Sequence, residues 1–213
     1  MPEQVPPGRA GRLWLAGRLA SARRSQELLD RKRSLLRREV DRREHLRHEA
    51  RQRWVDSCVE AERWGLRATV VEGATAVALS ASSVADRAEV DVTWRNTMGV
   101  HHPDDAVCTL APLSSSEAAA AGAAIAPAAA AYRSALGAAV ACAVADASWR
   151  LLSDELHAID RRHRAIERRR IPDLERSLHQ LVLRLDEFER EDRVVTRWAQ
   201  RHQGDRSDRT SSS

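Results

Sequence analysis

The feature that most constrains this chain is a long stretch without a helix-breaking residue. After the opening Pro6-Pro7-Gly8, only Gly11 and Gly17 interrupt a helical pattern before Gly65. A helix over that stretch has about 58 residues and is about 85 Å long at 1.5 Å per residue. A compact domain of 213 residues cannot contain such a rod. The sequence therefore predicts an elongated, mainly α-helical protein.

The composition agrees with long helices that bury narrow stripes. Only 4% of the residues are aromatic and 31% are charged, which is unfavourable for a large globular core. Basic residues concentrate in the first helical segment, because residues 9–66 hold 16 basic and 9 acidic side chains. Such a basic face suits an acidic protein surface, a nucleic acid or an anionic lipid, and charge alone does not choose among them.

Neither a disulfide framework nor a membrane span is predicted. Cys58, Cys108 and Cys142 lie far apart and form no CxxC pair, which favours a reducing compartment. We find no run of about 18 apolar residues and no apolar core of a signal peptide near the first residue. We therefore expect the protein to associate with a membrane only through partners.

Apolar residues recur with an average spacing of about 3.5 positions in both halves of the chain, as in a coiled coil. Around Pro172 the spacing becomes four, four, four, a stutter that unwinds a supercoil locally, and the proline itself predicts a bend. The first stripe is Leu15, Leu19, Ala22, Gln26, Leu29, Arg33, Leu36, Val40, Arg43, Arg47, Ala50, Trp54, Ser57 and Ala61. The second is Leu152, Leu156, Ile159, His163, Ile166, Arg170, Leu174, Leu178, Leu181, Leu185, Phe188, Asp192, Val195 and Ala199.

The middle of the chain shows a different period. Val90, Val92 and Trp94 alternate with polar residues, which indicates a β-strand. Two short runs rich in β-branched residues flank Gly73 and favour a second small hairpin. We therefore predict one or two β-hairpins in residues 67–113.

Two long helices with a small insertion between them bury their stripes most simply on each other. The predicted fold is all-α in the main, a long antiparallel two-helix coiled-coil hairpin with a small β-hairpin insertion in the middle. If both termini lie at one tip, Leu15 lies near Val195 and Trp198, and Leu36 lies near Leu178. The predicted parts are an N-terminal extension (1–8), a first coiled-coil helix (9–66), a β-hairpin and loop insertion (67–113), a second coiled-coil helix bent near Pro127 and Pro172 (114–203), and a disordered tail (204–213).

No motif indicates catalysis or a cofactor. The only lysine, Lys32, follows no glycine-rich loop, which excludes a P-loop, and the sequence contains no GxSxG, HExxH or GxGxxG motif. His45 and His48 share a helical face, but the arginines around them would repel a cation. We expect a protein that is not an enzyme and that has neither a metal site nor a cofactor.

The arginines of the first helix raise the question of nucleic-acid binding. Guanidinium groups grip phosphates, but i,i+4 pairs with nearby carboxylates explain the same pattern as a solvated face. No aromatic residue lies between Trp14 and Trp54, so a stacking platform for single strands is missing. Two alternative functions stay open: a basic coiled-coil scaffold and a nucleic-acid-associated helical hairpin.

Apolar residues near both ends of the predicted coiled coil form a candidate contact surface. An exposed apolar tip on a charged rod usually marks a surface for a partner. The candidate partner-binding residues of this tip are Leu13, Trp14, Leu15, Arg18, Val195 and Trp198.

Three segments carry a family pattern. Residues 161–192 combine paired arginines, an apolar-Glu step, an Ile-Pro pair and a leucine-rich helix that ends in an acidic-Arg-Glu run. Residues 27–36 contain a Leu-Leu-x-x-Lys-Arg step, and residues 96–103 contain a Met-Gly-Val-x-x-Pro loop. Together these segments resemble the D subunits of the V/A-type rotary ATPases, with Arg164 standing where the family usually has an asparagine. The resemblance rests on Leu28, Leu29, Lys32, Arg33, Met98, Gly99, Val100, Pro103, Arg161, Arg162, Ala165, Ile166, Glu167, Ile171, Pro172, Leu185, Glu187, Glu189, Arg190 and Glu191.

The resemblance implies a non-catalytic central rotor shaft of a V/A-type rotary ATPase or ATP synthase. Such a shaft couples ATP hydrolysis or synthesis in a catalytic hexamer to transmembrane movement of protons or sodium ions. The implied partners are the catalytic A and B subunits, the F subunit and the C/d subunit that serves as the membrane-ring adaptor, with no nucleic acid. The implied location is cytoplasmic, peripheral to the plasma membrane as part of the complex.

Overall fold

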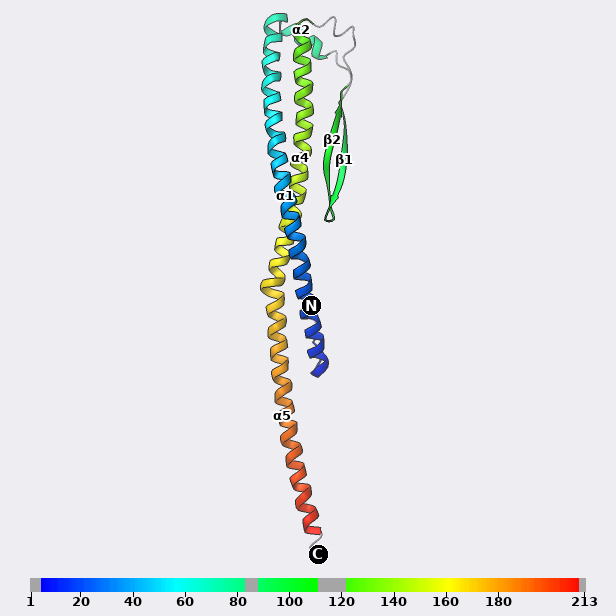
Figure 1. The fold of residues 1–213 in the computed structure, drawn as a ribbon, viewed down its shortest axis with the longest axis vertical. Coiled ribbons are helices and arrows are strands. Elements are labelled where there is room, and N and C mark those ends of the chain that lie inside the picture. Colours follow the sequence, from blue (N-terminus) through cyan, green and yellow to red (C-terminus); the bar gives the residue numbers. More distant parts are fainter. Residues whose placement is uncertain (1–4, 83–87, 111–121, 211–213) are drawn as a thin grey trace. The chain divides into compact units, whose positions relative to one another are not determined.

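The computed structural model contains two long helical segments separated by a two-stranded β-hairpin (Figure 1). The elements are α1 (Gly8–Glu72), α2 (Ala74–Ser82), β1 (Glu89–Thr97), β2 (Val100–Thr109), α4 (Ile125–Ala165), a π-helical turn (Ile166–Arg170) and α5 (Ile171–Thr210). The structure describes residues 5–82, 88–110 and 122–210, with side chains up to Trp198. The predicted fold class, mainly α-helical with a long helix pair and a small β-hairpin in the middle, is confirmed.

The chain divides into two compact units. The terminal unit comprises Met1–Arg31 and Asp160–Ser213, and the central unit comprises Lys32–Ile159. The first part of α1 therefore belongs to the terminal unit and the remainder of α1 to the central unit. Each unit has its own buried residues and its own ion pairs between helices.

In the terminal unit, the first part of α1 packs against α5 through a small apolar cluster. Leu15, Leu19 and Leu174 are its buried members, with at most 9% of each side chain exposed. Burying one leucine contributes about 1.5–3 kcal/mol, so this cluster is a main source of cohesion between the two helices. Partly buried residues that pack around it are Trp14, Ala22, Ile171, Leu178 and Leu181.

Ion pairs show that the two helices of the terminal unit are antiparallel, as predicted. Arg9 contacts Glu189, and Arg23 contacts Glu175, each with 2.8 Å between the guanidinium nitrogen and the carboxylate oxygen. Along the contact, the residue numbers of α1 therefore increase while those of α5 decrease. Both pairs are largely exposed, and pairs of this kind contribute less than about 1 kcal/mol each.

The predicted pairing of residues across the two helices is wrong. Leu15 packs with Leu174, not with Val195 and Trp198, which are 63% and 62% exposed. Leu178 also belongs to the Leu15 cluster, so the predicted pairing of Leu178 with Leu36 is wrong as well. The prediction assumed helices of equal reach, whereas α5 continues to Thr210 after Glu189 has already met the first turn of α1.

In the central unit, α1 runs antiparallel to α4. Lys32 contacts Glu155 at 3.0 Å, and Arg47 contacts Asp146 at 2.6 Å. The buried residues near the Lys32 level are large, including Leu36, Val40, Leu152, Leu156 and Ile159. Toward the β-hairpin connection they become small, namely Ala50, Ala61, Ala68, Ala124, Ala128 and Ala135.

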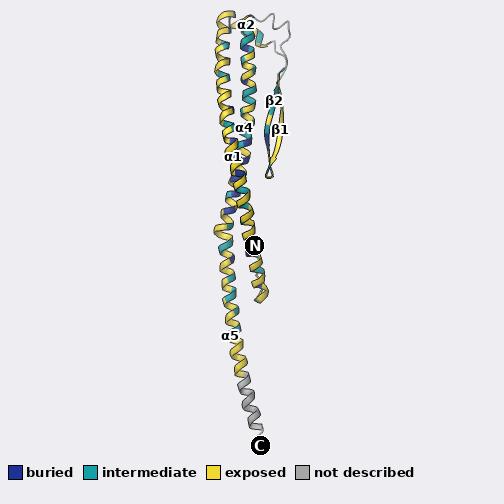
Figure 2. Cartoon of the chain, viewed as in Figure 1, coloured by how far each residue is buried: buried dark blue, intermediate teal, exposed yellow. Residues whose placement is uncertain are grey.

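The predicted stripe on α1 is confirmed at every position except Trp54. The other thirteen positions are buried or half-buried, whereas Trp54 is 36% exposed. Figure 2 shows buried, half-buried and exposed residues along the helices. An indole is too large for a stripe whose buried neighbours are Ala50 and Ala61. On the second stripe Arg170, Phe188, Asp192 and Val195 are exposed, and the side chain of Ala199 lies outside the described residues.

The β-hairpin is confirmed over Glu89–Thr109, where β1 and β2 pair antiparallel. Met98 and Gly99 form its two-residue turn, with φ angles of 54° and 87°. Positive φ at both central positions is the type I′ pattern, whose twist matches the flanking strands. A register irregularity between Thr93 and Trp94 leaves Asp104 of β2 without a paired residue on β1, so the extra residue interrupts the alternation of side chains along β2.

The second predicted hairpin, around Gly73, is wrong. α1 continues to Glu72, and Ala74–Ser82 forms the helix α2. Gly73 has a φ of +86°, which ends α1 in the way glycine commonly does. Alanine fills much of this segment, and its helix propensity outweighs the strand preference of Val70, Val71 and Val77.

The predicted end of the second helix differs from the observed one at the tail. Pro127, near which a bend was predicted, lies in the first turn of α4, and residues 114–121 lie outside the described part. α5 runs to Thr210 where a disordered tail was expected after Gly204. A single interior glycine costs a helix only about 1 kcal/mol, which does not end it.

Near Pro172 the structure has a π-helical turn. The backbone N–H of Ile171 donates to the carbonyl of Ile166, five residues earlier, so one extra residue is inserted into the helix. Arg170 is consequently exposed, and Ile171 takes its place beside the Leu15 cluster. The second helix is therefore irregular near Pro172, as predicted. The irregularity is one inserted residue, whereas the sequence predicted a stutter in the coiled-coil spacing.

One helical stretch passes a composition test for membrane spanning. Residues Ile125–Trp198 contain an 18-residue window with a mean hydropathy of 1.4, of which 11% is buried. Polar residues divide this stretch, so the sequence shows no uninterrupted apolar run there. Its many alanines nevertheless raise the mean hydropathy of the window. The test concerns length and composition only, and one helix that passes it is weak evidence for a membrane span.

Candidate partner-binding surfaces

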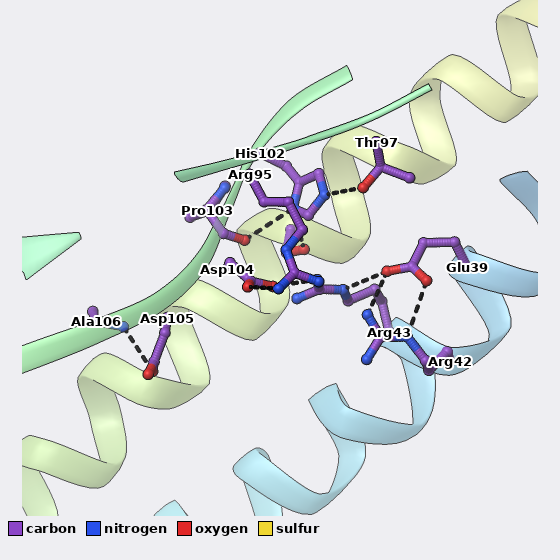
Figure 3. Close-up of polar contacts among 11 residues, drawn as sticks. Glu39, Arg42, Arg43, Arg95, Thr97, His102, Pro103, Asp104, Asp105 and Ala106 are labelled. Atoms are coloured by element: carbon purple, nitrogen blue, oxygen red, sulfur yellow. Dashed lines mark hydrogen bonds and ion pairs between the residues drawn. The ribbon is translucent and has the colours of Figure 1, made fainter. Parts of the chain in front are cut away.

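A buried arginine holds the β-hairpin on α1 (Figure 3). Arg43 is only 4% exposed and donates through Nε to Glu39, at 2.9 Å, and through Nη2 to Asp104 of β2. Arg95 of β1 contacts the other oxygen of Asp104 at 2.9 Å. The spacing of apolar residues in the sequence placed Arg43 on the predicted stripe of α1, but it did not indicate that Arg43 contacts the β-hairpin.

The charges of this cluster stabilise the ionised carboxylates. Hydrogen bonds from Arg42, and then from Arg43, lower the pKa of Glu39 to about 2, although burial opposes the shift. The hydrogen bond from Arg43 likewise lowers the pKa of Asp104, with help from the charge of Arg95. Both carboxylates are therefore ionised at neutral pH, and each balances an arginine.

A fully buried histidine holds the β-hairpin on α4. The Nδ1 of His102 lies 3.0 Å from the carbonyl oxygen of Pro103 and 3.0 Å from Oγ of Ser148, and Nε2 lies 2.9 Å from Oγ1 of Thr97. A carbonyl only accepts, so the hydrogen bond to Pro103 requires a proton on Nδ1. Sequence reasoning missed this role of His102, because its contact with Ser148 spans 46 positions and leaves no local signal.

The turn end of the β-hairpin presents an aromatic surface to solvent. Trp94 is 52% exposed and stacks on His101, with ring centroids 5.0 Å apart and planes at 13°. Met98, in the turn, is 46% exposed. Because His102 and Arg43 fix the β-hairpin from its inner side, this surface stands on a supported element.

The six candidate tip residues do not come together. Leu15 is buried in the core, Trp14 is half-buried beside it, and Leu13 is 72% exposed. The guanidinium of Arg18 lies 5.3 Å from the ring of Trp14, a cation–π contact. The other two residues, Val195 and Trp198, lie on the part of α5 that follows Glu189.

The part of α5 from Phe188 onward has an exposed apolar face. Phe188, Val194, Val195 and Trp198 are each more than 60% exposed. Exposed apolar side chains in such number on one helix usually mark a contact surface. Two separate surfaces, one at the start of α1 and one on α5, thus replace the predicted single tip.

The residues that carried the family resemblance occupy three structural places. Lys32 pairs with Glu155 in the central unit, while Leu29 and Arg33 are half-buried and Leu28 is 65% exposed. Met98, Gly99, Val100 and Pro103 form the turn of the β-hairpin and the start of β2. Those at the end of α4 and in the π-helical turn are Arg161, Arg162, Ala165, Ile166 and Glu167, followed in α5 by Ile171, Pro172, Leu185, Glu187, Glu189, Arg190 and Glu191.

A cluster of metal ligands is absent from the part of the chain that the structure describes. Within residues 5–82, 88–110 and 122–210, no group of three or more His, Cys, Asp and Glu side chains could hold a metal ion. Cys58, Cys108 and Cys142 are free and half-buried. The exposed apolar and aromatic surfaces described above are suited to contacts with other proteins.

Comparisons with known proteins point the same way as these surfaces and the long helix pair. Residues 13–201 match the family model for the D subunit of ATP synthase. The chain is also 30% identical to the D subunit of the A-type ATP synthase from Methanopyrus kandleri over 196 residues, which covers 90% of this chain and 84% of the relative. With a match over most of its length, this chain belongs to the family of ATP synthase D subunits and is a component of a V/A-type rotary ATPase.

Proposed function

We propose that this protein is the non-catalytic central rotor shaft of its complex. The observation that carries the proposal is α1, an unbroken helix of 65 residues that is paired antiparallel with α5 in the terminal unit and with α4 in the central unit. A helix pair with a buried stripe resists twisting better than a single helix, because side-chain packing must be broken before the helices can slide. Torque applied at one part can therefore be carried to another.

In this role the shaft couples ATP hydrolysis or synthesis by the A and B subunits to proton or sodium movement through the membrane. The F subunit and the C/d subunit, the ring adaptor, are the further partners. The shaft would lie on the cytoplasmic side, at the plasma membrane only as part of the complex. None of these steps requires chemistry on this chain.

The exposed face of α5 formed by Phe188, Val194, Val195 and Trp198 is the part we assign to the cavity of the catalytic hexamer. It supports that role because exposed apolar side chains gathered on one helix usually mark a contact with another protein. The basic face of α1 can slide along acidic or polar walls without a single deep energy minimum. Reversing Arg37, Arg38 and Arg42 to glutamate should therefore weaken coupling.

Affinity purification of the tagged native chain from detergent-solubilised membranes tests the proposal. Recovery of the A, B and F subunits with ATPase activity in the eluate would support the rotor role. Their reproducible absence would favour a free coiled-coil scaffold, and co-purification of nucleic acid with steep salt dependence would favour the nucleic-acid alternative.

The α5 surface has a sharper test in the reassembled complex. Changing Val195 and Trp198 to Asp should uncouple ATP hydrolysis from ion movement while the helix content of the isolated chain stays unchanged. Changing the exposed Arg193 and Arg197 of the same segment to Gln is the matched control, because it makes the net charge more negative by the same two units. Equal uncoupling by both pairs would argue against the apolar contact.

A further inference from the structure

The side chains of α5 from Glu187 to Trp198 are sorted by type around the helix axis. An α-helix advances about 100° per residue, which fixes the direction of each side chain relative to that of Phe188. Val195, Trp198 and Val194 lie about 20°, 80° and 120° from Phe188, all in the same sense of rotation. Each of the four side chains is more than 60% exposed. They therefore share one exposed face of α5, about 120° wide.

Carboxylates accompany these apolar side chains. Glu187 and Glu191 point into the same arc of about 120°, and Asp192 borders it, about 40° from Phe188 in the opposite sense. All three acidic side chains are exposed. We call these three residues, together with the four apolar ones, the acidic-apolar face of α5.

The arginines of the same stretch lie on the other side of the helix. Arg190, Arg193 and Arg197 fall within an arc of about 60°, whose centre is about 170° from Phe188. All three are exposed. Arg193 contacts Glu189 at 3.6 Å, and Glu189 also contacts Arg9 of α1 at 2.8 Å. This stretch of α5 is therefore apolar and negative on one side and positive on the other.

The acidic-apolar face is accessible to another molecule. α1 packs on the preceding part of α5, where Leu174 is buried. The first turn of α1 contains Arg9, whose partner on α5 is Glu189. Val195 therefore lies beyond the start of α1. Phe188 and Val195 are each 63% exposed, which leaves the face available to a partner.

The charges of this face define the chemistry of that partner. Exposed apolar side chains in such number mark a contact with another protein. Phosphate groups repel the carboxylates beside them, which disfavours a nucleic acid or an anionic lipid at this face. Lysine and arginine side chains attract the same carboxylates. The matching surface is therefore that of a protein, apolar at its centre and basic at its edge.

We propose that the acidic-apolar face of α5 docks on an apolar protein surface bordered by lysine or arginine side chains, and that this surface belongs to the catalytic hexamer. The identification of the hexamer rests on the proposed rotor role, whereas the chemistry of the surface follows from the residues of α5. Because the arginines lie on the opposite side of α5, the contact is specific for one orientation of the shaft. A half-turn would present Arg190, Arg193 and Arg197 to the same basic side chains and break the contact.

Binding of the full-length chain to the A/B hexamer, purified without this chain, tests the proposal. Phe188→Ser combined with Val195→Ser should lower the affinity about tenfold, because two apolar contacts are lost. Glu191→Lys should lower the affinity about fivefold, because the new positive charge meets like charges on the hexamer. All three positions are exposed, so circular dichroism of the variants should show the helix content of the parent.

Asp186→Lys is the matched control for Glu191→Lys. Asp186 is exposed, lies in the same part of α5 and undergoes the same change of charge. Its direction is about 160° from Phe188, on the side of the arginines. The control should therefore change the affinity less than about twofold. Higher salt should reduce the difference in affinity between Glu191→Lys and the parent, because salt screens the charges.

The binding results separate this inference from the rotor role. A larger loss for Glu191→Lys than for Asp186→Lys, together with the loss in the double serine variant, would support the proposal. Equal losses in the two lysine variants would overturn it, and so would a double serine variant that binds like the parent. In those cases the parent chain still binds the hexamer, so the rotor role stands. Absence of binding by the parent would count against the rotor role and this inference together.

Sedimentation of the chain without the hexamer tests the other possible occupant of the face. The parent chain should sediment as a monomer. A dimer that the double serine variant dissociates would show that a second copy of this chain covers the acidic-apolar face, and it would overturn the assignment to the hexamer.

Discussion

Arg43 of α1 and Asp104 of β2, 61 positions apart in the sequence, form an ion pair in which the arginine is buried and the carboxylate is half-buried. Glu39 accepts a second hydrogen bond from the same guanidinium at 2.9 Å. One arginine thus balances carboxylates from a helix and a strand. This relationship makes the β-hairpin part of the folded central unit and leads to the first predictions.

Changing Arg43 to Leu should destabilise the chain by about 2 kcal/mol, because the half-buried carboxylates of Glu39 and Asp104 each lose one of their two arginine partners. Urea denaturation followed by circular dichroism measures the loss. Arg42→Leu is the control, since that side chain is 50% exposed and its pair should contribute about 0.5 kcal/mol. Equal losses in the two variants would contradict the burial argument.

Acid should weaken the same cluster through Glu39. Its pKa falls from 4.5 to about 2 on folding, so its contribution is present above pH 4.5 and disappears as the pH falls toward 2. The difference in unfolding free energy between the parent and Glu39→Gln should therefore shrink over that range. A difference that is constant with pH would show that Glu39 is not the titrating partner.

His102→Ala should destabilise the chain by about 3 kcal/mol, because it removes a fully buried ring and leaves the Pro103 carbonyl and the Ser148 hydroxyl without that partner. The exposed neighbour His101→Ala should cost less than about 1 kcal/mol, the value of its stacking on Trp94. Thermal denaturation of both variants provides the comparison. A larger loss for His101 would mean that the β-hairpin is held from its outer face.

Leu36→Ala should cost about 3 kcal/mol, since Leu36 is completely buried and truncation leaves a cavity between the helices. Leu28→Ala is the matched control, because that leucine is 65% exposed and its truncation should cost about 0.5 kcal/mol. Both free energies follow from urea titrations at one temperature. Similar costs would indicate that α1 does not bury Leu36 in solution.

Local periodicity predicted much of the structure. The stripe on α1 was found from spacing alone, because coiled-coil packing buries every third or fourth residue whatever the partner. The strand of Val90, Val92 and Trp94 was found for the same reason with a period of two. Pro172 revealed the irregularity in the second helix, because its missing N–H acts locally.

Pairing across the chain was not predictable in this way. The stripe specifies that α1 and the later helix meet, but a repeating stripe fits at many offsets, so Leu15 was paired with Val195 when its neighbour is Leu174. Because the offset between the helices was wrong, the predicted single tip corresponds to two separate surfaces in the structure. Arg43 and His102 gave no sign of their role, because their partners lie far away in sequence.

The sequence by itself determined that this chain forms two long helices with a strand pair between them and that it belongs to the family of ATP synthase D subunits. Those properties depend on local spacing, helix propensity and short motifs, which are written along the chain. Only the tertiary structure decided the offset of the helices, the π-helical insertion that presents Ile171 in place of Arg170, and the attachment of the β-hairpin through Arg43 and His102. These depend on which side chains exclude water together, and that is a property of the packed chain and not of any segment.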